Sequence, residues 1–114
     1  MEAAWLACHT VLTAAVDGTP LNSPHPSVQQ ALNAIDSACT SFIQEILSVA
    51  PIGSNRSAPV TEVRIAQAQV RRYVQGDARV GEVFDTRDMI TLCLSRAYAA
   101  TEAAQQGLLP ATIV

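Results

Sequence analysis

The chain has 114 residues, contains no lysine and carries a formal net charge of −3. It is therefore long enough for one domain only, and its charge argues against general binding to a phosphate backbone. Apolar residues make up 49% of the chain and charged residues 15%, whereas about 25% of a typical globular protein is charged. We therefore expect part of the apolar surface to be covered by a second copy or by another protein.

The charges are unevenly distributed along the sequence. Residues 1–55 carry acidic side chains and no basic one, and all seven arginines lie between Arg56 and Arg96. The 56–96 segment has a net charge of +2 and the remainder −5. The arginine usage of a GC-rich genome accounts for this pattern without any function. The alternative is a local surface for association.

Cys8, Cys39 and Cys93 are far apart in the sequence and form neither a metal-binding nor a C-x-x-C spacing. We interpret them as small core residues, on three different apolar faces, in a reducing compartment. Glu2 stands where a signal peptide carries positive charge, and no apolar run approaches the ~20 residues of a membrane span. The sequence thus predicts a cytoplasmic protein with no membrane association, no cofactor and no metal site.

Residues 2–16 are expected to form a first helix that is apolar nearly all round. Trp5 and Val16 belong to its main stripe, whereas Leu6 lies on the other side. A helix of this kind is buried on most sides, so we predict that Trp5 and Leu6 take part in self-association. His9 falls at the edge of the stripe, where we expect a hydrogen-bonded or solvated boundary residue.

Residues 27–49 show the most regular pattern in the chain. Apolar residues recur at alternating spacings of four and three, the rhythm of an amphipathic helix, at Val28, Leu32, Ile35, Cys39, Phe42, Ile46 and Val49. Ser27 and Gln30 have the form of a capping box at its start, and Pro51 and Gly53 end it. Its apolar stripe is wide enough to contact two neighbours, as in a helical bundle.

A third helix is predicted over residues 59–75, with Ser57 as its cap. Its buried stripe is Val60, Val63, Ala66, Val70, Tyr73 and Val74. Arg64, Arg71 and Arg72 lie on the opposite side with Ile65 among them. One interpretation is a solvated face, and the other is a docking face for a protein partner. Nucleic acid is the less favoured partner, because such sites usually carry more basic and aromatic residues.

A fourth helix is predicted over residues 86–106, capped by Asp85 or Thr86. Its apolar side is formed by Met89, Ile90, Cys93, Leu94, Ala97, Ala100 and Ala104. Arg96 falls inside this apolar arc, where a charge must be paired or lie at the edge of an interface. We expect Arg96 either to form an ion pair with Asp36 or Glu45, or to bind an acidic group of a partner.

The last seven residues of the sequence are apolar and uncharged, and they include Leu108 and Leu109. We expect this segment to dock on the bundle or on a neighbouring chain. Leu108 and Leu109 therefore join Trp5 and Leu6 as predicted self-association residues.

Tyr98 and Glu102 form a Tyr-x-x-x-Glu pattern on the fourth predicted helix. The pattern resembles the export signal of type VII secretion substrates, which are also small, helical and alanine-rich. The Trp-x-Gly turn of that family is absent, because Trp5 is followed by Leu6 and Ala7. The resemblance covers five residues, and we do not assign the chain to that family.

The sequence as a whole predicts an all-α fold, a single helical bundle of about four helices. The favoured function is a non-enzymatic interaction module that self-associates and docks a partner through Arg64, Ile65, Arg71, Arg72 and Arg96. A small nucleic-acid-associated factor is the first alternative. A bundle with an apolar ligand or enzyme site in its core is the second, although no paired carboxylates, histidine-rich helix or phosphate loop indicates a catalytic residue.

Overall fold

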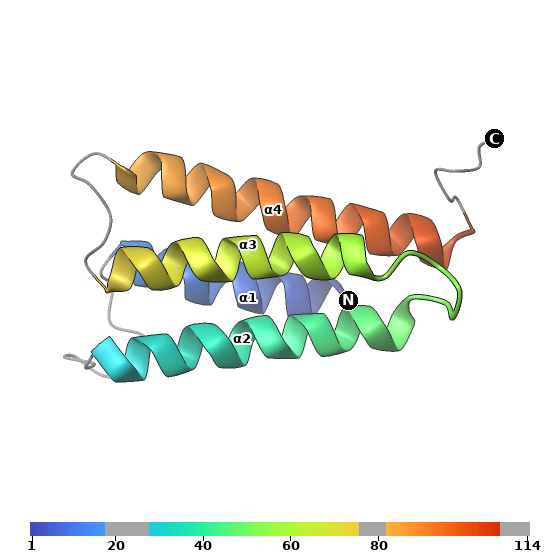
Figure 1. Ribbon diagram of the computed structural model, residues 1–114, viewed down its shortest axis with the longest axis horizontal. Coiled ribbons are helices and arrows are strands. Elements are labelled where there is room, and N and C mark those ends of the chain that lie inside the picture. The colour runs from blue at the N-terminus through green and yellow to red at the C-terminus, as the bar shows by residue number, and fades with distance from the viewer. Residues whose placement is uncertain (18–27, 76–81, 108–114) are drawn as a thin grey trace.

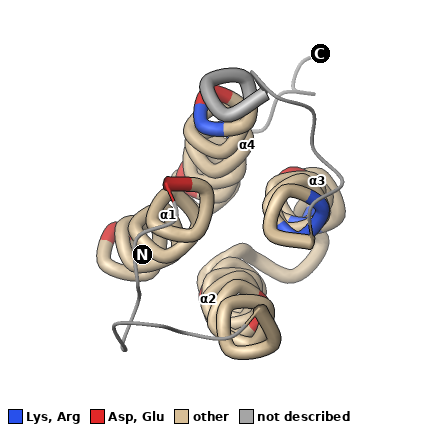
Figure 2. Tube along the Cα trace, turned by 90° about the vertical axis from the view of Figure 1, so that its left-hand side faces the viewer, with Lys and Arg blue, Asp and Glu red and all other residues tan. Residues whose placement is uncertain are grey.

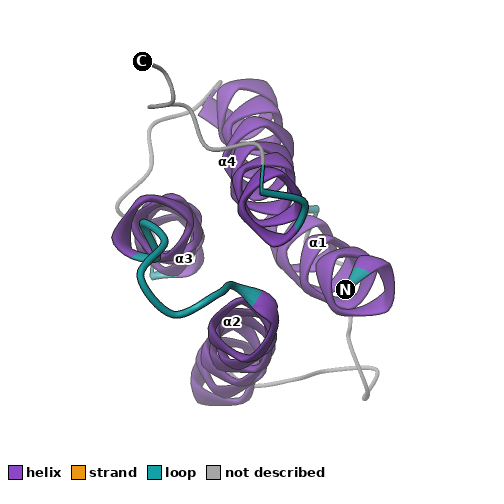
Figure 3. Ribbon diagram, turned by 90° about the vertical axis from the view of Figure 1, so that its right-hand side faces the viewer, coloured by secondary structure: helices purple, strands orange, loops and turns teal. Residues whose placement is uncertain are grey.

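The computed structural model describes residues 1–17, 28–75 and 82–107, with the side chains of the last range described from Thr86 onward. Its four helices are α1 (Glu2–Val16), α2 (Val28–Val49), α3 (Ser57–Val74) and α4 (Glu82–Gln105) (Figure 1). Helices that follow one another in the chain run in opposite directions. Seen from the end, each helix packs on two neighbours in the ring α1, α2, α3, α4 (Figure 3). The all-α bundle predicted from the sequence is confirmed.

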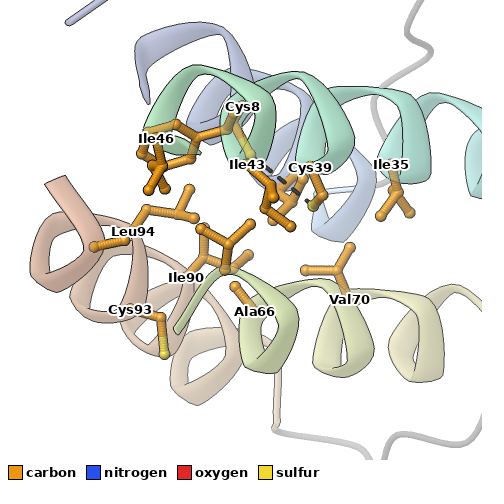
Figure 4. Close-up of a cluster of buried hydrophobic side chains, with 14 of the residues drawn as sticks. Cys8, Ile35, Cys39, Ile43, Ile46, Ala66, Val70, Ile90, Cys93 and Leu94 are labelled. Carbon is orange, nitrogen blue, oxygen red and sulfur yellow. Dashed lines mark hydrogen bonds between the residues drawn. The ribbon is translucent and has the colours of Figure 1, made fainter. Parts of the chain in front are cut away.

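The core forms where the apolar stripes of the four helices meet. Figure 4 shows Ile43 and Ile46 of α2 pointing toward Ile90 and Leu94 of α4. The largest fully buried side chain is Phe42 of α2, which has no exposed surface. Truncating such a residue to alanine costs about 3–5 kcal/mol of stability, since the transferred area is lost and a cavity remains. The regular pattern of residues 27–49 therefore marks the helix that supplies much of the core.

The loop between α2 and α3 is shaped by a glycine turn and by a hydrogen bond from an arginine of the loop to the end of α2. Gly53 adopts a φ of +93°, which a residue with a Cβ rarely adopts. The Arg56 guanidinium donates a hydrogen bond of 2.8 Å to the carbonyl oxygen of Ala50, just beyond the last residue of α2. A cation is favourable at this end of a helix. The loop therefore satisfies a carbonyl that the end of α2 leaves without a helical partner.

Helix α3 begins at Ser57, two residues earlier than predicted. Ser57 lies inside the helix, and the side-chain oxygen of Asn55 accepts the hydrogen bond from the backbone N–H of Ala58, at 3.3 Å. The prediction that Ser57 caps this helix is therefore wrong. Asn and Ser offer the same kind of acceptor at a helix start, so their proximity in the sequence left the capping residue ambiguous.

Helix α4 begins at Glu82, four residues before the predicted start. Thr86 therefore lies within the helix, so the expected cap at Asp85 or Thr86 is wrong. Acidic residues are favourable in the first turn of a helix, which suits an early start at Glu82. Thr86 is 1% exposed, and its hydroxyl has no hydrogen-bond partner among the described residues. Thr101, also buried, instead donates to the carbonyl oxygen of Ala97 at 2.8 Å.

Candidate functional site

The arginines of α3 line a shallow hollow on its outer surface, with a volume of about 390 Å³. It is lined by Arg64, Gln67, Ala68, Arg71, Arg72 and Gln75. Positions three, four, seven and eight residues apart lie on one side of a helix, so the helical repeat alone brings these side chains together. The structure thus groups three of the predicted partner-binding residues, Arg64, Arg71 and Arg72, at one place.

A carboxylate of the neighbouring helix binds two of the residues that line this hollow. Asp36 of α2 accepts a hydrogen bond from the Gln67 amide at 2.8 Å and a second from the Arg71 guanidinium. Arg71 and Asp36 also form an ion pair. Gln67 in turn accepts a hydrogen bond from Arg64 at 2.7 Å. The network restricts the rotamers of Arg64, Gln67 and Arg71, so less conformational entropy is lost when a ligand binds.

Three guanidinium groups line the hollow, and the one on Arg71 is paired with the Asp36 carboxylate. Arg64 and Arg72 are exposed, whereas Arg71 is half-buried. In the described helices, arginines occur only on α3 and α4, whereas the charged residues of α1 and α2 are all acidic (Figure 2). The hollow on the outer face of α3 therefore holds three of the arginines of these helices.

The other two predicted partner-binding residues lie outside the hollow. Ile65 is on α3 and is 44% exposed, while Arg96 is an exposed residue of α4. The predicted ion pair of Arg96 is wrong, because Asp36 binds Arg71 and Glu45 lies 3.9 Å from the N-terminal amino group. The apolar arc of α4 is wider than the face that packs on the bundle, so Arg96 lies on its uncovered part.

The two predicted self-association residues of α1, Trp5 and Leu6, lie on different sides of the helix. Trp5 is half-buried and packs against the core. Leu6, one residue further, is 53% exposed. Exposed Ala3 and Ala7 share its outer face, and none of these three side chains is charged. Leu108 and Leu109 lie outside the described residues.

The helix packing brings Cys8 of α1 and Cys39 of α2 together, with their sulfur atoms 4.0 Å apart (Figure 4). The three cysteines lie on the apolar faces of three different helices, and the faces of α1 and α2 meet in the core. The shared hydrogen bond and burial raise the pKa of Cys8 well above its usual range. Burial is the main cause that raises the pKa of Cys93 to about 11, and the neighbouring Glu62 is the second cause. High thiol pKa values and burial are typical of structural rather than reactive cysteines.

No group of metal-ligating side chains comes together within residues 1–17, 28–75 and 86–107, the ranges whose side chains the structure describes. In the same ranges, no helix combines the length and apolarity needed to cross a membrane. A comparison of this chain with known protein families, curated proteins and solved structures found no match. Evidence for function must therefore come from the residues of the chain and their placement.

Sequence reasoning found the arginines of this site but missed Asp36 and Gln67. A signal was present, because Arg64, Gln67 and Arg71 are spaced three and four apart and so lie on one line of the helix. Asp36 was noted only as a candidate partner of Arg96. Its true partners depend on how α2 and α3 are aligned, which no pattern within a single helix specifies.

Proposed function

We propose that this protein is a non-enzymatic interaction module that docks an acidic segment of a partner protein on the arginine hollow of α3. The observation that carries the proposal is the convergence of Arg64, Arg71 and Arg72 on one hollow. A guanidinium group matches a carboxylate in two parallel hydrogen bonds, so a cluster of arginines favours Asp and Glu side chains. Exposed Ile65 on the same helix supplies an apolar contact beside these charges.

A second part of the proposal is self-association through the outer face of α1. Leu6 is 53% exposed and lies beside the small, exposed side chains of Ala3 and Ala7, which supports close approach by a second helix. On α4, Arg96 is exposed together with Met89 and Leu92, and we assign this surface to partner contacts as well. The three free, buried cysteines support a reducing, cytoplasmic location.

Docking of an acidic segment is tested with a fluorescent hexaglutamate peptide, followed by fluorescence anisotropy. We expect saturable binding that weakens as salt rises, since the hollow is open to solvent. The Arg64→Gln/Arg72→Gln double variant should weaken binding about tenfold, because each exposed charge pair contributes up to about 1 kcal/mol. A hexaglutamine peptide should not bind.

The matched control is the Ser41→Glu/Ser48→Glu variant, which changes the net charge by the same amount on the exposed face of α2. It should bind the hexaglutamate peptide nearly as well as the original chain. Equal weakening in both variants would show that only overall charge matters and would reject the hollow as the site. Preference for a single-stranded oligonucleotide over the peptide would reject a protein partner.

A further inference from the structure

A second pocket, separate from the arginine hollow, lies between α1 and α4. It has a volume of about 330 Å³ and is lined by Glu2, Trp5, Ser95 and Tyr98. The two aromatic rings meet edge to face, with their centroids 6.1 Å apart and their planes at 68°. Two aromatic walls and a carboxylate therefore surround a space larger than a small organic ion.

The surroundings of this pocket are acidic. Burial and the nearby carboxylates of Glu102 and Glu2 raise the pKa of Tyr98. None of the four lining residues is basic. The indole N–H of Trp5 is buried and has no hydrogen-bond partner among the described residues. The pocket thus offers π faces and anionic oxygen atoms, the chemistry that attracts an organic cation.

The ring of Trp5 is held in place by His9. The two rings stack with their centroids 5.4 Å apart and their planes at 21°. His9 is held in turn by a hydrogen bond between its Nε2 and the Thr91 hydroxyl, at 2.9 Å. Burial and the positive charge of Arg87 lower the pKa of His9, so the imidazole is neutral near pH 7 and does not repel a cation. The aromatic wall is therefore in place before any ligand arrives.

We propose that this pocket binds the guanidinium group of an arginine side chain. A guanidinium is flat and weakly hydrated, so it stacks on aromatic rings more readily than a compact ammonium and still pairs with a carboxylate. Glu2 supplies that carboxylate, and the rings of Trp5 and Tyr98 supply the stacking surface. The pocket has the opposite charge preference to the α3 hollow, so this inference goes beyond the proposed function and stands without it.

The sole tryptophan of the chain is Trp5, so its fluorescence and its indole ¹H–¹⁵N resonance report on this pocket directly. The probe is N-acetyl-L-arginine amide, titrated at constant ionic strength. N-acetyl-L-citrulline amide, which has nearly the same shape but no charge, is the control ligand. We expect a saturable change with the arginine compound and none with the citrulline compound.

The Glu2→Gln variant should weaken binding of the arginine compound about threefold to fivefold, as expected for one solvent-exposed charge contact. Asp88→Asn is the matched control, because it removes the same charge from an exposed position seven residues, about 10 Å along the helix, before Ser95. Circular dichroism confirms that each variant is folded. The proposal is overturned if the arginine compound gives no saturable change, if citrulline acts equally, or if both variants behave alike.

Two further measurements of Trp5 fluorescence show which molecule supplies the arginine side chain that enters the pocket. If a second copy supplies it, Trp5 fluorescence of the chain alone changes on dilution, and Arg96→Met, which removes an exposed arginine of α4, abolishes that change. If another molecule supplies it, dilution leaves the signal constant while the arginine compound still binds. Both results support the pocket and differ only in the partner.

Discussion

His9 of α1 connects to α4 through its hydrogen bond to Thr91, and it stacks on Trp5 of its own helix. Its pKa is lowered in the folded chain by burial and by Arg87, so the unfolded chain takes up a proton more readily. The contribution of neutral His9 to stability is therefore complete above the pKa of an unfolded histidine, about 6.5, and is lost as the pH falls below it.

We predict that the free energy of unfolding decreases from about pH 7.5 to about pH 5.5, the range around the unfolded histidine pKa. In the His9→Gln variant the decrease should be smaller, because glutamine keeps a hydrogen-bonding group and does not titrate. Urea unfolding at the two pH values, followed by circular dichroism, measures both slopes. Equal slopes in the two proteins would show that His9 does not cause the pH dependence.

The thiols of Cys8 and Cys39 should be unreactive in the folded protein. Both side chains are buried, and the pKa of Cys8 is raised, so little thiolate is present near neutral pH. We predict that a thiol reagent such as dithionitrobenzoate modifies both residues no faster than the chain unfolds. In urea, where the chain is unfolded, all three cysteines should react rapidly. Rapid modification of Cys8 or Cys39 in the native protein would contradict the packing of α1 on α2.

Sequence reasoning at the level of single residues succeeded where a residue belongs to a helical stripe and failed where its partner lies on another helix. The burial of Ile35 and Val70 follows from their spacing alone. The exposure of Arg96 does not, because an apolar arc shows which residues are able to pack but not which part of the arc meets a neighbour. The same limit hid the unpartnered hydroxyl of Thr86, which depended on where α4 begins.

Among the helices, α2 and α3 are joined by the network of Asp36, Gln67 and Arg71. The side chains of Asp36 and Arg71 are 42% and 34% exposed, so water and salt screen their attraction. We predict a coupling free energy of about 0.5 kcal/mol between them from a double-mutant cycle with Asp36→Asn and Arg71→Gln.

The unfolding measurements for this cycle are made at low and at high salt, and the coupling should shrink as salt rises. A comparison cycle is made on Asp17, at the end of α1, and Arg87 of α4, whose Oδ1 and Nη1 atoms are 2.9 Å apart. It should give a similarly small coupling free energy. A coupling near zero for Asp36 and Arg71 at low salt would contradict the view that this pair positions the arginine hollow.

The helices themselves were predictable because each has an apolar stripe of the correct period. The predicted range 2–16 coincides with α1, and the predicted start of α2, residue 27, precedes the observed Val28 by one residue. The largest error was the start of α4, where Glu82 begins the helix four residues early. The sequence near that start contains polar and acidic residues, which are common both in loops and in the first turn of a helix. Periodicity alone therefore did not show whether the helix had already begun.

In the whole molecule, the uneven charge distribution of the sequence becomes a division between two halves of the bundle. The charged side chains of α1 and α2 are all acidic, and the arginines of the described helices are on α3 and α4 (Figure 2). Among the described residues, two ion pairs connect the halves, Asp36 with Arg71 and Asp17 with Arg87. The sequence asymmetry therefore contributes to internal pairing, and it also gathers three arginines on the outer face of α3.

The apolar excess of the sequence is only partly absorbed by the core. Leu6 of α1 and Leu92 of α4 remain 53% and 49% exposed, and Ile52 in the loop after α2 is 93% exposed. Exposed apolar residues of this size are common singly, but together with a charged share of 15% they favour a covered surface in the assembled state. The proposal as a whole is that this molecule works by association, and this surface is the part of it that we assign to a second copy of the chain.

The most direct test of that claim is the solution mass, measured by size-exclusion chromatography with light scattering at about physiological salt, where weak charge contacts are screened. We predict a mass of at least twice 12.1 kDa for the chain and a mass of 12.1 kDa for the Leu6→Glu variant, with an unchanged helical circular dichroism spectrum. Leu6→Ala, which adds no charge, should weaken the assembly less. A mass of 12.1 kDa for the unaltered chain, or an assembly that Leu6→Glu leaves intact, would contradict self-association through α1.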